Sequence, residues 1–191
     1  MRRLFLALAA PKLPQAVEDR IDAALRGLSG ARRTAPEMRH ITLAFLGDVS
    51  EERISDIAAA MRAAATRAAR IPYAFDRLGG FPGRNARILA VTGETPPALA
   101  ALAADLGRGL RAAGLPADPK PLRLHLTVAR LREASSLPAQ AIEKVTAAAE
   151  EIRLYESELL SAGAHYSLLE TSQLLDALHT PRGPETEEGG D

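Results

Sequence analysis

The chain has 191 residues, of which 47% are hydrophobic and 25% charged, and its formal net charge is zero. These values are typical of a globular protein with one sizeable domain or two small lobes. Cysteine is absent, which excludes disulfides, thiol catalysis and cysteine-bound zinc, and no apolar run approaches the roughly 20 residues that span a bilayer. We therefore expect a cytoplasmic protein without membrane association.

Charge is unevenly distributed along the chain. Residues 181–191 carry a net charge of −3, which leaves +3 on the rest, and all basic residues except Lys12, Lys120 and Lys144 are arginines. Arginine suits bidentate phosphate binding, whereas the long basic stripe of a nucleic-acid groove is missing. An arginine-rich chain is also typical of a GC-rich genome, so this pattern favours a local phosphate site only weakly.

Seven strands and four helices are predicted. The apolar run Leu4–Ala9 is interpreted as a buried strand rather than a signal peptide, because it is short and Pro11 follows it. Apolar spacing near 3.6 predicts helices over Leu13–Leu28, Glu51–Ala69, Pro97–Ala113 and Ala139–Glu150. Short β-prone runs predict the other strands, over Ile41–Leu46, Tyr73–Leu78, Ile88–Thr92, Leu122–Leu131, Ile152–Leu160 and His165–Leu169.

Several residues mark the ends of these elements. Ser50 is expected to cap the second helix and Gly114 to end the third. The sequence GGFPGRN at 79–85 predicts a turn between two strands. We expect a single domain over residues 1–180, followed by a disordered tail over 181–191, which is rich in Pro, Gly and Glu.

The element order suggests an internal duplication. It runs β-α-β-α-β and then β-α-β-α-β-β, so that each half places one strand containing His-x-Thr between two helices. The two motif histidines, His40 and His125, are 85 residues apart, a little under half the chain. We therefore expect an α+β fold of two similar lobes facing one another, with helices covering one face of each sheet.

The two His-x-Thr strands are the strongest candidates for a functional site. Because side chains alternate along a strand, His40 and Thr42 share one face, as do His125 and Thr127, while the intervening apolar residues face the core. A single such histidine is more often a packing residue than a catalyst. Two copies at equivalent places in two halves favour a site.

This pair of motifs suits chemistry at phosphorus. One neutral imidazole can take a proton from a nucleophile while a protonated one gives a proton to a leaving oxygen. The threonine hydroxyls can hold anionic oxygens between them, so in-line displacement needs no metal and no other cofactor. A metal site is the alternative, but no Asp or Glu lies on the same face of either strand to complete it.

The sequence resembles the 2H phosphoesterases, and within them the bacterial and archaeal RNA 2′,3′-cyclic phosphodiesterases, also called 2′-5′ RNA ligases. The resemblance extends to about residue 175 and rests on five segments: RRLFLAL at 2–8, PEMRHITLAFLGDV at 36–49, GGFPGRNARILAV at 79–91, LHLTVAR at 124–130 and SELLSAGAHYSLLE at 157–170. It implies a bilobal fold with a pseudo-two-fold axis through a central cleft, built from two similar antiparallel sheets with helices outside. It also implies hydrolysis of RNA 2′,3′-cyclic phosphates to 2′-phosphate ends, and in some members reversible joining of tRNA halves through 2′-5′ bonds.

The resemblance assigns a role to each motif residue. His40 is implied to be the proton donor to the departing O3′, and His125 the proton acceptor that activates water. Thr42 and Thr127 are implied to hold the non-bridging phosphate oxygens, with Arg130 near the phosphate. The expected partners are RNA ends or nucleotides with a cyclic phosphate, including tRNA halves, and a monomer is expected.

Arg130 does not fit strict strand alternation, which places it on the face opposite His125, so that reaching the site needs a bulge or a strand end. Arg123 has the correct parity and is the reserve candidate, whereas Arg39 has not. Leu124 stands where relatives commonly carry proline, a change that we expect to affect local backbone more than chemistry.

Four other residues are candidates for the surroundings of the same site. We expect His165 to pack on a late strand, His179 to be solvated and Phe45 to face the core, whereas Phe81 remains open to stacking on a nucleobase. A hypothesis of another class is a non-catalytic module that binds RNA ends or nucleotides in the same cleft.

Overall fold

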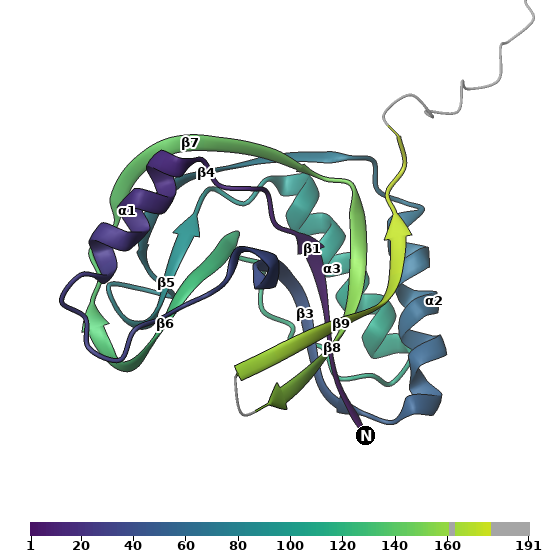
Figure 1. Ribbon diagram of the computed structural model, residues 1–191. Coiled ribbons are helices and arrows are strands. Elements are labelled where there is room, and N and C mark those ends of the chain that lie inside the picture. The colour runs from purple at the N-terminus through teal and green to yellow at the C-terminus, as the bar shows by residue number, and fades with distance from the viewer. Residues whose placement is uncertain (161–162, 177–191) are drawn as a thin grey trace, which may run out of the picture.

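The computed structural model describes residues 1–160 and 163–176 and contains two antiparallel sheets (Figure 1). The helices are α1 (Gln15–Leu25), α2 (Ile54–Ala65) and α3 (Pro97–Ala112). The strands are β1 (Arg2–Ala9), β2 (Arg32–Arg33), β3 (His40–Val49), β4 (Ile71–Gly80), β5 (Asn85–Thr92), β6 (His125–Ser136), β7 (Gln140–Ala149), β8 (Glu151–Leu160) and β9 (Gly163–Gln173). This confirms the expected α+β class, and the strand predicted at Leu4–Ala9 is β1.

The two sheets have matching strand orders once the short strand β2 is set aside. One sheet runs β3-β1-β8-β9 and the other β2-β6-β5-β4-β7, so that β3 and β6, the two His-x-Thr strands, occupy equivalent places. In the same way α1 lies between β1 and β3 in the chain, and α3 between β5 and β6. The lobes are not the two halves of the chain, however, because β8 and β9 join the first sheet and β4 joins the second.

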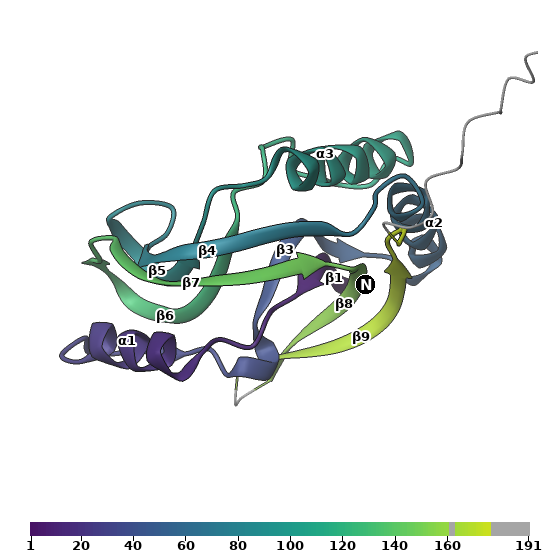
Figure 2. The ribbon, with the colours of Figure 1, turned by 90° about the horizontal axis from the view of Figure 1, so that it is seen from above.

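Helices cover the sheets from outside. The helix α1 packs against β7, α2 against β8 and β9, and α3 against β3 and α2. Figure 2 shows α1 and α3 on opposite sides of the strands. No helix in the described ranges is long and apolar enough to cross a membrane.

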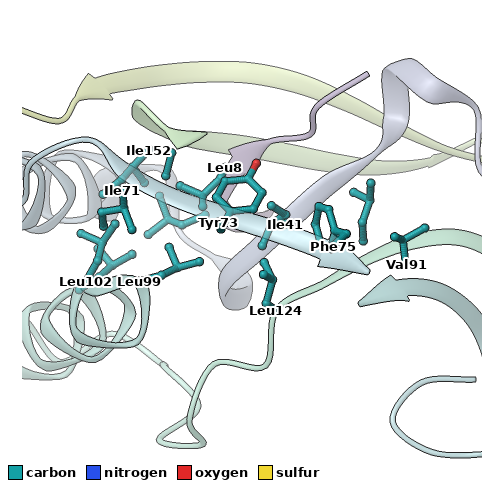
Figure 3. Packing of buried hydrophobic residues seen from close by; sticks show 14 of the residues in the cluster. Leu8, Ile41, Ile71, Tyr73, Phe75, Val91, Leu99, Leu102, Leu124 and Ile152 are labelled. Carbon is teal, nitrogen blue, oxygen red and sulfur yellow. The ribbon is translucent and has the colours of Figure 1, made fainter. Parts of the chain in front are cut away.

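Buried apolar side chains from both sheets and from α3 form one cluster (Figure 3). Leu8 of β1, Ile41 of β3, Phe75 of β4 and Leu99 of α3 all belong to it and are at most 1% exposed. Because the sheets share this core, the relative position of β3 and β6 is set by dense packing rather than by a hinge.

The prediction of a fourth helix over Ala139–Glu150 is wrong, since this segment forms β7. It supplies the edge strand that pairs with β4 from Ile71 onward, and α1 covers it. Alanine has a high helix propensity, and Ile142 and Val145 are spaced three apart as on a helix face. A register irregularity, in which β7 advances four residues while β4 advances two, removes the period of two that would have indicated a strand. The second motif strand therefore does not lie between two helices in the chain.

The predicted helix ends were partly right. Gly114 has a φ of +70° and its amide donates to the carbonyl of Arg111, so it ends α3 as expected. Ser50 makes no side-chain capping bond, and a 3₁₀ turn over Glu51–Arg53 precedes the shorter helix α2. The predicted tail over 181–191 and His179 lie outside the described residues.

Candidate active site

A β-bulge follows the threonine of the second motif. Thr127 and Ala129 pair with consecutive residues of β5, so that Val128 is an extra residue on β6. An extra residue reverses the alternation of side chains beyond it. Ala129 is consequently buried and Arg130 exposed, on the same face of the strand as His125. The bulge that the sequence required for Arg130 is present.

A matching bulge follows the threonine of the first motif. Thr42 and Ala44 pair with consecutive residues of β1, so that Leu43 is the extra residue on β3. Phe45, the counterpart of Arg130, is turned outward in the same way and is 48% exposed. The expectation that Phe45 faces the core is therefore wrong, because it assumed unbroken alternation.

The two imidazoles are held in the same way. Nδ1 of His40 lies 3.0 Å from the carbonyl oxygen of Met38, and Nδ1 of His125 lies 2.8 Å from that of Arg123. A carbonyl oxygen can only accept, so Nδ1 is the protonated nitrogen of each neutral ring, as inferred from its partner. Each ring therefore keeps Nε2 for a second partner.

Burial and neighbouring cations favour the neutral form of both rings. Burial lowers the pKa of His40; the Met38 carbonyl opposes this, while the charges of Arg130 and His125 act in the same direction as burial. Burial likewise lowers the pKa of His125, opposed by the Arg123 carbonyl and reinforced by the charges of Arg123 and Arg130. The field of Arg130 thus reaches both histidines, which is expected if all three border one site.

Aromatic side chains surround His40. The ring centroid of His40 lies 4.7 Å from that of Phe5 and 5.2 Å from that of Tyr166, which meets it edge-on at 82°. Tyr155 stacks on Phe5, with 5.3 Å between the ring centroids. These rings restrict the orientation of the imidazole and account for its burial.

His125 has different surroundings. Its ring stacks on Phe81 at 3.8 Å with only 7° between the planes. The guanidinium carbon of Arg123 lies 4.8 Å from the Phe81 ring centroid, and Arg123 also donates a hydrogen bond of 3.0 Å to the carbonyl of Pro82. Arg123, the reserve candidate, is thus held against Phe81 beside His125.

Two hollows border the candidate site and differ in chemistry: His125 lines the first, and Met38 and Tyr166, which contact His40, line the second. The first, here called the aromatic pocket, has a volume of about 520 Å³ and is lined by residues including Thr42, Phe45, Phe81, Arg123 and His125. The second, here called the arginine groove, has a volume of about 680 Å³ and is lined by residues including Arg32, Arg33, Arg130, Arg132 and Tyr166. Thr42 of one sheet and His125 of the other line the same pocket, so the two motifs share a cleft.

The remaining sequence candidates lie away from this cleft. Arg39 is 6% exposed and donates hydrogen bonds of 2.6 and 3.1 Å to Glu18 on α1, so it faces away from the site, as its parity indicated. His165 is exposed on β9, so the packing role expected for it is wrong. Within residues 1–160 and 163–176, no three or more His, Asp or Glu side chains are grouped as metal ligands would be.

Sequence reasoning missed the aromatic residues around His40 and the position of Arg132. Tyr166 belongs to β9, far from the motifs in the chain, and Phe5 belongs to β1; only the strand order brings them to His40. Arg132 shares the face of Arg130 by ordinary alternation, and the bulge brings both to the face of His125. No local pattern in the sequence signals either feature.

Comparisons with known proteins identify the family to which the chain belongs. A family model described as the 2′-5′ RNA ligase superfamily matches residues 10–160. The RNA 2′,3′-cyclic phosphodiesterase of Archaeoglobus fulgidus is 27% identical over 186 residues, which cover 95% of this chain and 94% of that protein. A solved structure from Thermus thermophilus is similar with a TM-score of 0.77 and 28% identity, covering 92% of this chain and 99% of that one. E. coli LigT complexed with 3′-AMP is similar with a TM-score of 0.71 and 25% identity, covering 91% of this chain and 98% of that one. The chain belongs to the 2′-5′ RNA ligase superfamily, and its recognition as a 2H phosphoesterase is confirmed.

Proposed function

We propose that this protein hydrolyses the 2′,3′-cyclic phosphate ends of RNA to 2′-phosphomonoesters by two-histidine acid–base catalysis. The observation that carries the proposal is the pair of histidines on equivalent strands, each fixed through Nδ1 with Nε2 left for substrate. The name of the Archaeoglobus relative, an RNA 2′,3′-cyclic phosphodiesterase, supports the same substrate.

In the proposed reaction, Nε2 of neutral His125 takes a proton from water as the water oxygen attacks phosphorus. The bond from phosphorus to O3′ breaks, and protonated His40 gives its proton to that oxygen, which leaves a 2′-phosphate and a 3′-hydroxyl. Thr42 and Thr127 donate hydrogen bonds to the non-bridging oxygens, and Arg130 offsets their charge. Attacking and leaving oxygens lie on opposite sides of phosphorus in an in-line displacement, which suits one histidine from each sheet.

The lowered pKa of both rings suits the acceptor, which must be neutral. The donor must instead be protonated. A phosphate anion bound between the rings favours the charged form of a neighbouring imidazole, so substrate binding raises the pKa of the donor and favours its uptake of a proton from solvent.

The same step accounts for ligation when an RNA 5′-hydroxyl replaces water as the nucleophile, since attack on the cyclic phosphate then forms a 2′-5′ bond. We therefore propose RNA ends, including tRNA halves, as the partners, and a monomer in the cytoplasm as the active form. E. coli LigT was crystallised with 3′-AMP, and this supports nucleotide binding by this protein.

A product assay tests the proposal. The protein is incubated with a 2′,3′-cyclic nucleotide in EDTA, and the 2′- and 3′-phosphates are resolved. We expect the 2′-phosphate alone, at a rate that EDTA leaves unchanged. Loss of turnover in EDTA would indicate a metal enzyme, and binding without turnover would indicate the non-catalytic module.

A further inference from the structure

The face of β6 that carries His125 continues beyond the bulge as a row of arginines. Arg130 and Arg132 are exposed while Leu131 between them is buried, so the two arginines share a face, and both line the arginine groove. Arg32 of β2 pairs directly with Arg130, and residues directly opposed in an antiparallel pair share a face. The arginine groove therefore contains Arg130, whose charge acts on both histidines, and continues past Arg132.

The segment before β2 follows β6 closely at this point. Gly30 has a φ of +71°, and a Cβ added to it would lie 3.1 Å from Cβ of Arg132. Glycine thus lets the two backbones approach while leaving the Arg132 side chain exposed along the groove.

The charges along the groove are of one sign. Among the residues that the structure describes, none of those lining the groove is an aspartate or a glutamate. Arg33 is ion-paired with Glu18 and Asp22, but neither Arg130 nor Arg132 forms an ion pair within the part of the chain that the structure describes. A groove with cations left for an anion suits phosphate.

The aromatic pocket, which His125 lines, lacks this property. Lys120 is paired with Asp118 at 3.4 Å, and Arg123 lies against Phe81. Matching bulges place Phe45 in the aromatic pocket and Arg130 in the groove, so the pseudo-symmetric cleft has one aromatic side and one cationic side.

We propose that the arginine groove binds the phosphodiester immediately 5′ of the terminal cyclic nucleotide, with Arg132 as its main contact. The inference rests on the proposed function and extends it. With the cyclic phosphate at the histidines and the terminal nucleoside in the aromatic pocket, the preceding phosphate of the strand reaches Arg132. The protein then discriminates oligoribonucleotide ends from free cyclic mononucleotides.

The test compares kcat/KM for 2′,3′-cyclic AMP with that for a triadenylate ending in a 2′,3′-cyclic phosphate. We expect the wild type to prefer the trinucleotide by about tenfold, the effect of one charge-assisted contact. Arg132→Ala should remove most of this preference, and Arg132→Lys should keep part of it. Arg111→Ala, which removes an exposed arginine of α3 outside the groove, is the matched control and should leave the preference unchanged.

Salt dependence gives a second readout. For single-stranded nucleic acid each neutralised phosphate contributes about 0.7 to the slope of log affinity against log salt. Arg132→Ala should reduce the slope for the trinucleotide by about this amount, and Arg111→Ala should not.

Equal kcat/KM for the two wild-type substrates, or a wild-type preference that Arg132→Ala leaves intact, would overturn the inference. Hydrolysis of the mononucleotide reports on the proposed function separately. If neither substrate is turned over, the same comparison is made by equilibrium binding of both nucleotides. Equal binding by wild type and Arg132→Ala would then overturn the groove assignment.

Discussion

Replacing Arg130 tests whether the bulge in β6 has a functional consequence. The side chain is exposed, so Arg130→Ala should leave the fold intact. A hydrogen bond to a charged group contributes about 1.5–3 kcal/mol, which corresponds to a loss of about 10- to 150-fold in kcat/KM for the cyclic mononucleotide. Arg130→Lys keeps the charge without the bidentate fork and should lose less.

The pH dependence of kcat/KM should also shift in a defined direction in this variant. The charge of Arg130 lowers the pKa of both His40 and His125, so Arg130→Ala should raise both. Both limbs of a bell-shaped profile of kcat/KM should therefore move to higher pH. The profile is measured for wild type and variant across the range in which histidine titrates. A loss below about threefold with unmoved limbs would refute the placement of Arg130 at the phosphate.

Three further predictions concern the supporting residues. Phe81→Ala exposes His125 and raises its pKa, so the acid limb should move to higher pH if His125 is the acceptor; movement of the basic limb alone would reverse the two roles. Thr42→Ala should lower kcat/KM by about 10- to 100-fold, less than loss of a histidine, and an unchanged rate would remove the hydroxyl from the site. Glu18→Gln leaves the charge of buried Arg39 unpaired and should lower the free energy of unfolding by about 3–5 kcal/mol in a denaturant titration. Arg39→Met should lower it less, because Glu18 then keeps its ion pair with Arg33.

The Glu18 prediction has its own pH dependence. Burial raises the pKa of Glu18, but the hydrogen bonds and charges of Arg39 and Arg33 outweigh it and hold the pKa below its ordinary value of 4.5. The stabilisation is therefore fully present above the ordinary value and is lost as the pH falls through the lowered one. The difference between wild type and Glu18→Gln should shrink over that interval, and a difference independent of pH would contradict the ion-pair explanation.

Periodicity was enough to predict the strands that carry the motifs. His40 and His125 stand in apolar runs that continue for several residues. Buried and partly exposed side chains alternate from each histidine to the threonine of its motif, as expected. The fold class was predicted from the order of these elements. The shared cleft was predicted because two equivalent strands must be brought together for the motifs to act as a pair.

The wrong predictions for Phe45 and for the segment of β7 have a common physical cause. Bulges and edge pairing are decided by neighbouring strands, which a local pattern does not contain. Leu43 and Val128 look like ordinary core residues in sequence, yet as extra residues they turn Phe45 and Arg130 toward the cleft. The segment of β7 was predicted to be helical from its alanines, because its pairing with the edge of β4 depends on residues that are distant in the sequence.

The central claim is that the two histidines act as acceptor and donor in one displacement step, and a double-mutant cycle tests it most directly. The kcat for a 2′,3′-cyclic nucleotide is measured for His40→Ala, His125→Ala and the double variant, each checked for an unchanged unfolding transition. We predict that each single substitution lowers kcat by about 10²- to 10⁴-fold and that the double variant loses little more, since donor and acceptor act as a unit. A loss below about tenfold for either single variant would contradict the account.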